Sequence, residues 1–508
     1  MRTVKLNYIV SSKHLHMGKW MKEWLEKYRT LPIQLKASFW FLLCSFIQKG
    51  ISVISTPLFT RLMTAEEYGN FSVFNSWMTI VAIFVTLRLY YGIYVQGLVK
   101  FEEDQKRYSS SMQGLCLTLS LIWTAIYFLF SDFWNALFSL TTVQMIAMLI
   151  MVWMTSVFTF WAQEQRVNLN YKTLVFVTIL VSVLKPLLGV IFVILANDKV
   201  TARILSIALV EIMCYSSLFY MQMNRGKVFY SSKYWFYALR LNIPLVPHYL
   251  SMTILDSSDR IMIKEMVGPA EAGLYSLAYS ISQIMLIFNQ SLLQTITPWI
   301  YKKIKTGIID EIADVSYITL VFIAGINIIL IALAPEAVAF FAPKSYYDAI
   351  WVIPPVAMSV FFVFAYNLFA SFEFYYEKNK FIAIASISGA IVNLLLNYIF
   401  IPCFGAYAAG YTTLFCYLFF ALGHYIFMNK TLAVYLNGRH IFDKFILIKI
   451  CITFIACGFL LLLTYNSPNI RFFIVVVGIG SLFVKRKKIC QNAKLLLNIR
   501  HQKNKRLV

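Results

Sequence analysis

The stretch DSSDRIMIKEMVGPAEAGLYSLAY, residues 256–279, lies between two long apolar runs. It is one of the few places in the chain where charges, glycine and proline cluster. A partner lies near the start, where MTAEEYG (residues 63–69) can be aligned with VGPAEAG (residues 267–273), with Ala65 matched to Ala270. In both places the motif follows the first long apolar run of a group and precedes the second. The two motifs predict a chain of two similar halves, which is typical of transporters.

The composition indicates a membrane protein. Of the 508 residues, 60% are hydrophobic and only 13% are charged, and the mean hydropathy is +0.69. A soluble domain cannot carry that much apolar surface. A spanning helix needs about 20 apolar residues, whereas barrel strands read as short alternating segments. Because the apolar runs here are long and uninterrupted, the predicted fold class is an all-α polytopic membrane protein.

Fourteen apolar segments are candidates for transmembrane helices. They lie near residues 35–58, 70–97, 110–130, 142–162, 173–196, 202–223, 240–258, 273–298, 316–334, 350–371, 381–402, 408–428, 445–464 and 468–484. The seventh segment carries Pro244 and Pro247 and is shorter and more polar than its neighbours. The repeated motifs fall six segments apart, so both halves have the same orientation in the membrane. The sequence therefore predicts two six-helix bundles followed by two further helices.

This map divides the chain into six parts. They are a basic leader at 1–34, a first bundle at 35–223, a cytoplasmic linker at 224–239, a second bundle at 240–428, helices 13 and 14 at 429–484, and a basic tail at 485–508. In the leader, Trp20 and Trp24 share one face of a candidate amphipathic helix, opposite lysines and glutamates. Two interpretations of that segment stay open: a helix lying on the inner leaflet, or a flanking tail that affects only orientation.

Basic residues support the map. Most of the 45 Lys and Arg residues fall in the connections that are cytoplasmic when the N-terminus is inside, as the positive-inside rule requires. Both termini are then cytoplasmic. The net charge of +22 is explained by topology and contact with anionic lipid headgroups rather than by nucleic-acid binding.

Two stretches carry a family resemblance. They read SFIQKGISVISTPLFTRLMTAEEYGNFSVF at residues 45–74 and DSSDRIMIKEMVGPAEAGLYSLAYSI at residues 256–281. Both resemble oligosaccharide flippases of the multidrug/oligosaccharidyl-lipid/polysaccharide (MOP) exporter superfamily, and most of all the Wzx-type O-antigen and capsular polysaccharide transporters. The resemblance implies two helical bundles that form a V around a central cavity.

The same resemblance implies a substrate and a location. The substrate would be a glycan on an undecaprenyl-diphosphate carrier, moved by alternating access across the bacterial inner membrane for surface polysaccharide assembly. The partners implied are this lipid-linked glycan, the bilayer, and a polysaccharide polymerase with its chain-length regulator; no nucleic acid is expected.

Basic residues at membrane depth are candidates for binding the anionic headgroup. Lys49 lies in the first segment, Arg88 in the second and Lys185 in the fifth. Charges at that depth are costly and usually face a bundle interior or a water-filled cavity, and both Lys and Arg bind phosphate. Arg260 and His248 of the second half are weaker candidates. Each could instead pair with an internal carboxylate or extend to the membrane surface.

Carboxylates inside the segments are fewer. Glu211 lies midway along the sixth segment, and Asp256 and Asp259 are placed at the outer end of the seventh. Glu211 is either a coupling residue for protons or sodium or a structural partner of Lys185 or Arg88, and we favour the structural bridge. Asp259 and its neighbour Arg260 form either a gate between the halves or an exposed loop pair, and we favour the loop pair.

The proline-bearing seventh segment has two open interpretations. A helix bent at Pro244 and Pro247 could line the cavity and act as a hinge, because freed backbone groups are tolerated where neighbours or cavity water satisfy them. Alternatively, it is a kinked packing helix without a moving part.

Enzymatic functions find little support in the sequence. It contains no G-x-x-x-x-G-K-[ST] phosphate loop, and its 6 histidines and 8 cysteines show no metal-binding spacing. No cofactor is expected beyond a coupling ion. Three hypotheses remain: a lipid-linked oligosaccharide flippase, a drug or cation antiporter of the same superfamily, and a membrane glycan polymerase. The cationic intramembrane residues favour the flippase.

Overall fold

The computed structural model describes residue 30, residues 32–436 and residues 440–484, and every regular element in these ranges is a helix. The basic leader with its candidate amphipathic helix and the basic tail lie outside the described residues. The first half contains α2 (Ile33–Leu62), α3 (Ala65–Thr86), α4 (Gly92–Lys100), η1 (Glu102–Asp104), α5 (Gln105–Leu129), α6 (Ser131–Phe138), α7 (Thr142–Val167), α8 (Tyr171–Leu195), α9 (Lys199–Gly226) and α10 (Ser232–Asn242). The second half contains η2 (Ile243–Leu245), α11 (Val246–Met266), α12 (Pro269–Ser282), α13 (Ile284–Thr306), α14 (Asp310–Ala332), α15 (Ala334–Phe341), η3 (Lys344–Trp351), α16 (Ile353–Tyr375), α17 (Asn379–Phe404), α18 (Ala406–Tyr435), α19 (Lys444–Leu463) and α20 (Pro468–Val484).

Eleven helices of the described residues are long and apolar enough to cross a membrane. All fourteen predicted segments nevertheless fall on helices. The seventh, eighth and fourteenth do not reach the threshold for three different reasons. Helix α11 carries five charged residues, Asp256, Asp259, Arg260, Lys264 and Glu265. A break at Gln283 divides the eighth segment into α12 and α13, and α20 has only 17 residues. The all-α multi-pass membrane fold is therefore confirmed.

The second predicted segment is not one helix. It divides because α3 ends at Thr86, where Leu87 and Arg88 adopt left-handed backbone conformations with φ of 50° and 47°. Consecutive left-handed residues cannot continue a right-handed helix. The chain then turns and resumes as α4, and the Asn242 side chain donates a hydrogen bond to the carbonyl oxygen of Leu87.

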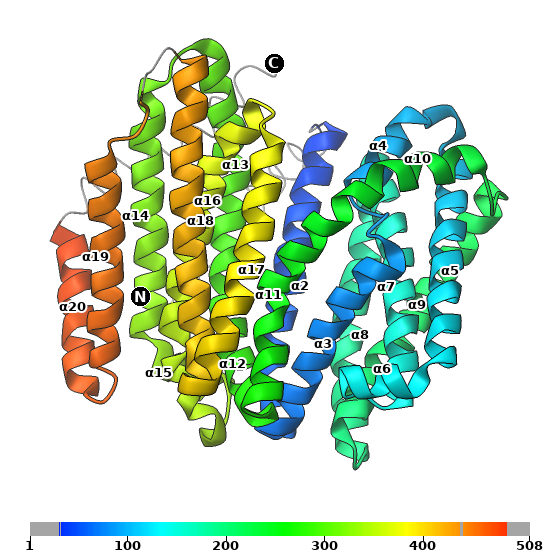
Figure 1. Cartoon of the computed structure of the whole chain (residues 1–508), viewed down its shortest axis with the longest axis horizontal. Coiled ribbons are helices and arrows are strands. Elements are labelled where there is room, and N and C mark those ends of the chain that lie inside the picture. Colours follow the sequence, from blue (N-terminus) through cyan, green and yellow to red (C-terminus); the bar gives the residue numbers. More distant parts are fainter. Residues whose placement is uncertain (1–29, 31, 437–439, 485–508) are drawn as a thin grey trace, which may run out of the picture.

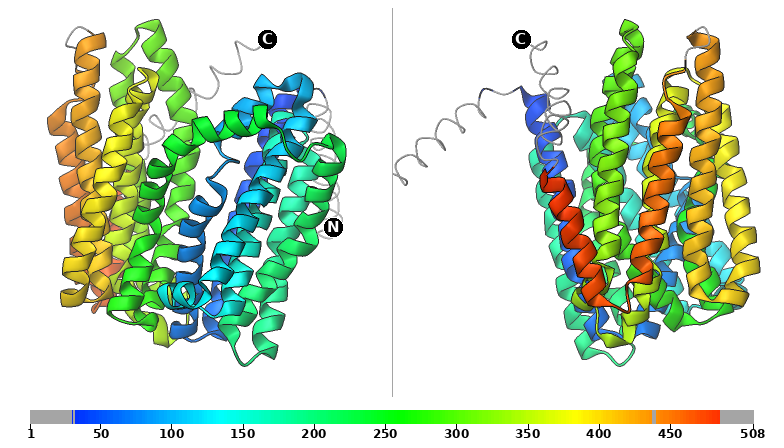
Figure 2. Two further views of the ribbon diagram at one scale, coloured as in Figure 1. Left: turned by 45° about the vertical axis from the view of Figure 1, so that its right-hand side comes forward. Right: turned by 90° about the vertical axis from the view of Figure 1, so that its left-hand side faces the viewer.

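The prolines of the seventh segment lie at a bend between two helices. Pro244 lies in η2, and Pro247 lies in the first turn of α11, where the missing N–H has no helical partner to lose. Asn242 and Val246, on the two sides of η2, keep right-handed helical backbone angles. Figures 1 and 2 show α10 crossing from the first half toward α11 and bending into it at this point. The bend that the prolines predicted is present, and its action as a hinge stays a hypothesis.

The helix order repeats between the halves. Each half has six spanning units, and the third unit of each is followed by a short helix, α6 after α5 and α15 after α14. Packing repeats as well: α7 packs on α9 as α16 packs on α18, and α2 packs on α8 as α11 packs on α17. Figure 1 shows the two sets side by side, with α19 and α20 on the outer side of the second. The structure therefore contains the repeat that the motifs predict.

The two motifs pack directly against each other. At the crossing of α3 and α12, a Cβ added to Gly69 would overlap the Pro269 carbonyl oxygen, and one added to Gly273 would overlap the Ala65 carbonyl oxygen. The contact is reciprocal, so Ala65 corresponds to Pro269 and Gly69 to Gly273. The alignment of Ala65 with Ala270 is thus wrong by one residue. Glycine lets the two helix backbones touch at this end of the molecule.

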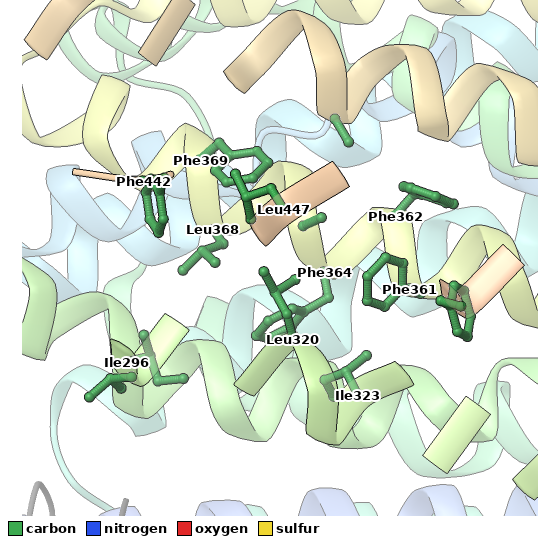
Figure 3. Packing of buried hydrophobic residues seen from close by; sticks show 14 of the residues in the cluster. Ile296, Leu320, Ile323, Phe361, Phe362, Phe364, Leu368, Phe369, Phe442 and Leu447 are labelled. Atoms are coloured by element: carbon green, nitrogen blue, oxygen red, sulfur yellow. The ribbon is translucent and has the colours of Figure 1, made fainter. Parts of the chain in front are cut away.

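The largest apolar cluster lies within the second half. Phe361, Phe364 and Leu368 of α16 point toward Leu320 and Ile323 of α14 (Figure 3), and all five are buried. On the other side, α19 contributes Leu447 to the same cluster. This packing joins α13, α14, α16, α18 and α19 in one bundle.

Candidate functional site

A polar cavity of about 320 Å³ lies between the two halves. The first half contributes part of α2, and the second half contributes parts of α11, α12, α13 and α15. The lining residues are Lys49, Ser52, Val53, Thr56, Arg260, Tyr279, Ser280, Ile281, Gln283, Ile284, Ile287 and Phe341. Two of the predicted headgroup residues, Lys49 and Arg260, are therefore brought together although they are far apart in the sequence.

Contacts on α11 and α12 orient Arg260. Its Nη1 donates to the carbonyl oxygen of Asp256 at 3.0 Å, one helical turn earlier, and its guanidinium lies 4.3 Å from the centroid of the Tyr279 ring. The Tyr279 hydroxyl in turn donates to Asp256 Oδ1 at 2.6 Å. Among the described residues, neither Arg260 nor Lys49 forms an ion pair with a carboxylate. The cavity therefore carries two positive charges that no ion pair in the described part of the chain neutralises.

The cavity lies where a repeat-related contact is missing. The repeat relates α2 to α11 and α3 to α12. Helix α3 packs closely along α11, so the repeat-related pair is α12 with α2. Within the described residues, α2 and α12 make no comparable contact. The cavity lies between these two helices, so one interface between the halves is closed and its repeat-related counterpart is open.

Arg88 and His248 lie at the closed interface instead. Arg88 Nη2 donates to Thr253 Oγ1 of α11 at 3.0 Å, and its guanidinium lies 6.0 Å from the Tyr249 ring centroid. His248 is the neighbour of Tyr249, with ring centroids 6.0 Å apart. The left-handed backbone at Arg88 directs this side chain to the opposite half. These two predicted residues are near each other, but neither is among the residues that line the cavity.

Lys185 forms an ion pair with Glu211. Its Nζ lies 2.6 Å from Glu211 Oε1, and the side chains are 29% and 3% exposed. Thr155 Oγ1 also donates to Glu211, at 3.2 Å. The pair joins α8, α9 and α7 inside the first half, so Lys185 does not join Lys49 in the cavity, as the headgroup prediction required. The arrangement is the structural bridge that we favoured for Glu211.

Asp259 is neither exposed nor in a loop, which corrects the favoured interpretation. It lies within α11 and is 1% exposed. Its carboxylate accepts hydrogen bonds from Tyr275 at 2.5 Å, from Asn397 at 2.6 Å and from Thr413 at 3.0 Å. Asp256 also lies within α11 and not at its outer end. Sequence analysis placed both residues at the end of the segment because clustered charges usually mark the end of a membrane-spanning helix.

The Asp259 network continues beyond its first donors. Asn397 also donates to Asn393 Oδ1 at 3.3 Å and accepts a hydrogen bond from Thr412. The cluster joins α11, α12, α17 and α18 and holds one carboxylate among neutral oxygen and nitrogen atoms. Such oxygens are the ligands that hard cations prefer. No group of three or more His, Cys, Asp or Glu residues suited to a metal occurs in the described part of the chain.

Two buried carboxylates escaped the sequence analysis. Gln222 Nε2 of α9 donates to Glu164 Oε2 of α7 at 2.5 Å, and His424 Nδ1 of α18 lies 2.9 Å from Glu373 Oε1 of α16. Glu164 and Glu373 each lie two residues beyond the end of a predicted segment, so both were taken as flanking residues. The signal that could have found them is their shared place, at the end of the fourth segment of each half.

Comparison with known proteins assigns the family. The family model described as "Polysaccharide biosynthesis protein" matches residues 34–303, a range that includes both repeated motifs, Lys49 and Arg260. The chain belongs to this family. The resemblance predicted from residues 45–74 and 256–281 is thereby confirmed at the level of the family.

Curated relatives match over part of their length. The chain is 26% identical over 209 residues to Lsg locus putative protein 1 of Haemophilus influenzae, covering 39% of this chain and 51% of the relative. It is 24% identical over 205 residues to an uncharacterized membrane protein of the same organism, covering 39% and 50%. The chain thus spans about half the length of the curated relatives that it matches.

Solved structures show the same fold. The lipid II flippase MurJ, in an inward closed conformation, matches with a TM-score of 0.66 and 15% identity, covering 88% of this chain and 99% of MurJ. An inward-facing multidrug resistance MATE family transporter of the MOP superfamily matches with a TM-score of 0.60 and 12% identity, covering 77% and 96%. This family member therefore has the fold of MOP superfamily transporters.

Proposed function

We propose that the protein transports oligosaccharide repeat units linked to undecaprenyl diphosphate across the bacterial inner membrane, for O-antigen, capsule or exopolysaccharide assembly. The observation that carries the proposal is the cavity between the halves, where Lys49 and Arg260 lack carboxylate partners. The headgroup of this lipid carries a diphosphate, and a Lys point charge with an Arg fork suits such a group. Family membership supports the polysaccharide pathway. The protein is then a transporter and not an enzyme.

The open side of the interface suits a lipid substrate. A lipid-linked glycan has a polar head that needs a hydrated site and a tail that stays in hydrocarbon. The cavity between α2 and α12 offers polar groups such as Ser52, Thr56 and Gln283 beside its two cations. We propose that the diphosphate binds Lys49 and Arg260 while the tail remains outside the cavity. Arg88 and His248 are proposed as secondary contacts that become available if the α3–α11 interface opens.

The packing of the halves supports a mechanism of alternating access. They touch backbone to backbone where α3 crosses α12, at Gly69 and Gly273, and Figure 1 shows them farther apart at the opposite end. With the N-terminus in the cytoplasm, the proposed topology puts this crossing on the exterior side. We propose that the halves rock about the interface, so that separation of α3 from α12 releases the substrate outside.

Asp259 is the proposed coupling residue. A buried carboxyl group that has only neutral hydrogen-bond partners is a place where a proton or a sodium ion can bind. The network reaches from α11, which carries Arg260 to the cavity, to α17 and α18. Binding an ion there would therefore change the packing of the helix that holds the substrate.

One alternative is a drug or cation antiporter. Such a transporter should present carboxylates to its substrate, whereas both charged residues that line the cavity are cations. A membrane glycan polymerase is the other alternative, and no feature of the cavity favours it over transport. A polymerase and a chain-length regulator are instead proposed as partners of the transporter.

Deletion of the gene in its native host tests the proposal. Accumulated undecaprenyl-linked repeat units on the cytoplasmic face, with loss of surface glycan, would support it. The double variant Lys49→Ala/Arg260→Ala should then fail to restore the glycan, while Lys185→Met/Glu211→Met, which removes an internal charge pair, should restore most of it. Repeat units exported but left unpolymerised would point to the polymerase. Unchanged glycan with altered drug sensitivity would point to the antiporter.

A further inference from the structure

The buried carboxylates Glu164 and Glu373 occupy repeat-related places but have different partners. Each lies near the end of the fourth spanning helix of its half, and each contacts the sixth, through Gln222 in the first half and His424 in the second. Glu373 is 0% exposed and His424 is 2% exposed. The fold therefore places a carboxylate and a nitrogen donor in the same position twice, once with an amide and once with an imidazole.

The partner in the first half cannot change its charge. Gln222 donates to Glu164, and Gln113 of α5 donates to Gln222 Oε1 at 2.6 Å and to the Val157 carbonyl oxygen at 3.2 Å. Amides neither gain nor lose protons near neutral pH. In the first half, a change of charge is therefore open to the carboxylate alone and not to its partner.

The partner in the second half can change its charge. Imidazole titrates near neutral pH and can donate from Nδ1 in either protonation state. Glu373 Oε2 is buried and has no hydrogen-bond partner, so no second donor stabilises a bare carboxylate there. With His424 neutral, that carboxylate leaves one net negative charge in the core, which is costly. One proton, on either partner, makes the pair neutral overall.

We propose that Glu373 and His424 form a proton-binding site of the second half. In the packed conformation the pair holds one exchangeable proton, and exposure of the pair to water on rearrangement of α16 and α18 allows its release. This inference deepens the proposed function, on which it rests, because it assigns a proton to a specific pair of atoms in the moving half.

The surroundings of the pair contain few other charges. The His424 ring contacts Tyr366 of α16, Phe381 of α17 and Phe420 of its own helix. No third charged side chain lies within ion-pair distance of either partner, among the side chains that the structure describes. Titratable groups of the surrounding helices have other contacts: Tyr301 of α13 on Tyr375, Tyr317 of α14 on the Asp443 backbone, and Asp259 of α11 in its own network. Tyr366 is then the one further titratable group in ring contact with His424.

A line of aromatic side chains connects the pair with the cavity. Tyr366 stacks on His424 with centroids 5.6 Å apart and on Tyr417 with centroids 6.1 Å apart. Tyr417 lies near Asp256 and Tyr279, the two residues that contact Arg260. We propose this line of side chains as the route by which a change of charge at Glu373 and His424 affects the cation that we assign to the substrate.

Histidine NMR of the whole protein tests the site without any transport. The protein is labelled with ¹⁵N-histidine, placed in lipid bilayers and titrated from pH 5 to 9. The resonance of His424 is identified by its loss in His424→Gln. We expect it to titrate, and its midpoint to move by about one pH unit or more in Glu373→Gln, but not in the matched variant Glu164→Gln. A His424 resonance that does not change between pH 5 and 9, or a midpoint that moves equally in both glutamine variants, would overturn the proposal.

Transport in vesicles separates this inference from the proposed function. Full-length protein is reconstituted with undecaprenyl-linked saccharide extracted from the host. Transport by the unaltered protein should depend on pH, and His424→Gln, which copies the Glu164–Gln222 arrangement, should reduce that dependence at least severalfold. If the unaltered protein transports nothing, the proposed function fails while the NMR result still decides the proton site. Equal pH dependence in both proteins would refute the coupling role of the pair.

Discussion

The two halves of the molecule neutralise their buried carboxylates in different ways. In the first half, Glu211 is paired with the ammonium of Lys185 at 2.6 Å, so the charges cancel within one rigid bundle. In the second half, Asp259 receives hydrogen bonds from Tyr275, Asn397 and Thr413, all of them neutral. The same helical architecture thus supports an ion pair in one half and a buried carboxyl group with only neutral hydrogen-bond partners in the other.

This difference indicates which half responds to ions. An internal ion pair gains little from binding a proton or a cation, because its two opposite charges already compensate each other. A carboxylate that has only neutral donors gains electrostatic stabilisation from either. Asp259 and the pair of Glu373 with His424 both lie in the second half, where we propose ion binding. The contact of Glu164 with Gln222 in the first half is the comparison that tests this proposal.

Replacing Asp259 should have the largest effect. In Asp259→Leu three buried donors lose their acceptor, and each unsatisfied group costs about 1–3 kcal/mol, so we expect destabilisation of about 3 kcal/mol or more. Asp259→Asn keeps the shape and one acceptor oxygen, and should stay folded while ion-coupled transport falls at least tenfold. Thermal unfolding in detergent and vesicle transport measure the two effects. Normal transport by Asp259→Asn would exclude Asp259 as the coupling residue.

The glycine crossing comes second and tests the one place where the halves are equivalent. Gly69→Ala and Gly273→Ala would each push a Cβ into the backbone of the other half, and overpacking of this kind costs about 1–3 kcal/mol. Because both substitutions act on one contact, the destabilisation of the double variant should be smaller than the sum of the two single destabilisations.

A matched control is available on α14. Gly325 has open space around its Cα, so Gly325→Ala should be neutral or stabilise by up to about 1 kcal/mol through helix propensity. Unfolding temperatures that fall equally for Gly325→Ala and Gly69→Ala would show that the crossing is not a close contact in the membrane.

Hydrophobicity was enough to predict the fold. All fourteen apolar segments fall on helices, because a membrane requires long apolar stretches whose backbone bonds are satisfied internally. The hydrophobic pattern did not predict every place where a helix breaks. The break at Leu87 and Arg88 involves no glycine or proline, whereas the bend between α10 and α11 lies at the prolines that predicted it.

The candidate site was only partly predictable. Sequence reasoning found Lys49, Arg88, Lys185 and Arg260 because charges at membrane depth are rare. It could not group them, since grouping depends on which helix faces which, and the structure joins Lys49 to Arg260 across the halves. Asp259 was placed in a loop because helix α11 has the composition of a connection, which is itself a consequence of its buried polar network.

Breaking the ion pair of the first half is the third prediction. Glu211→Gln leaves Lys185 as an uncompensated charge, and we expect destabilisation of about 1–3 kcal/mol, less than for a fully buried pair because Lys185 is 29% exposed. Lys185→Met/Glu211→Met removes both charges and should recover most of that loss. The unfolding temperatures of the single and the double variant measure these two effects. If transport, and not stability, is lost in the double variant, the first half also takes part in ion coupling.

The smallest effect concerns how the two motifs start their helices. Thr64 caps α3 in a capping box: its side chain accepts from the Glu67 N–H at 3.2 Å, and Glu67 Oε2 accepts from the Thr64 N–H at 2.7 Å. Helix α12 has no side-chain cap; Gly268, with φ of 149°, precedes Pro269 there. Loss of a cap costs about 1 kcal/mol, so Thr64→Ala should lower the unfolding temperature slightly.

Substitution at Gly268 should act through a different cause. Its backbone conformation is one that only glycine adopts readily, so Gly268→Ser should destabilise although serine is a good capping residue elsewhere. A stabilising Gly268→Ser would show that the two helix starts are interchangeable. A destabilising one means that the second motif depends on backbone freedom where the first depends on side-chain hydrogen bonds. The helices that bring Gly69 and Gly273 together then start in two different ways, one with a capping box and one with a glycine before proline. This difference explains why the motifs align so loosely in sequence.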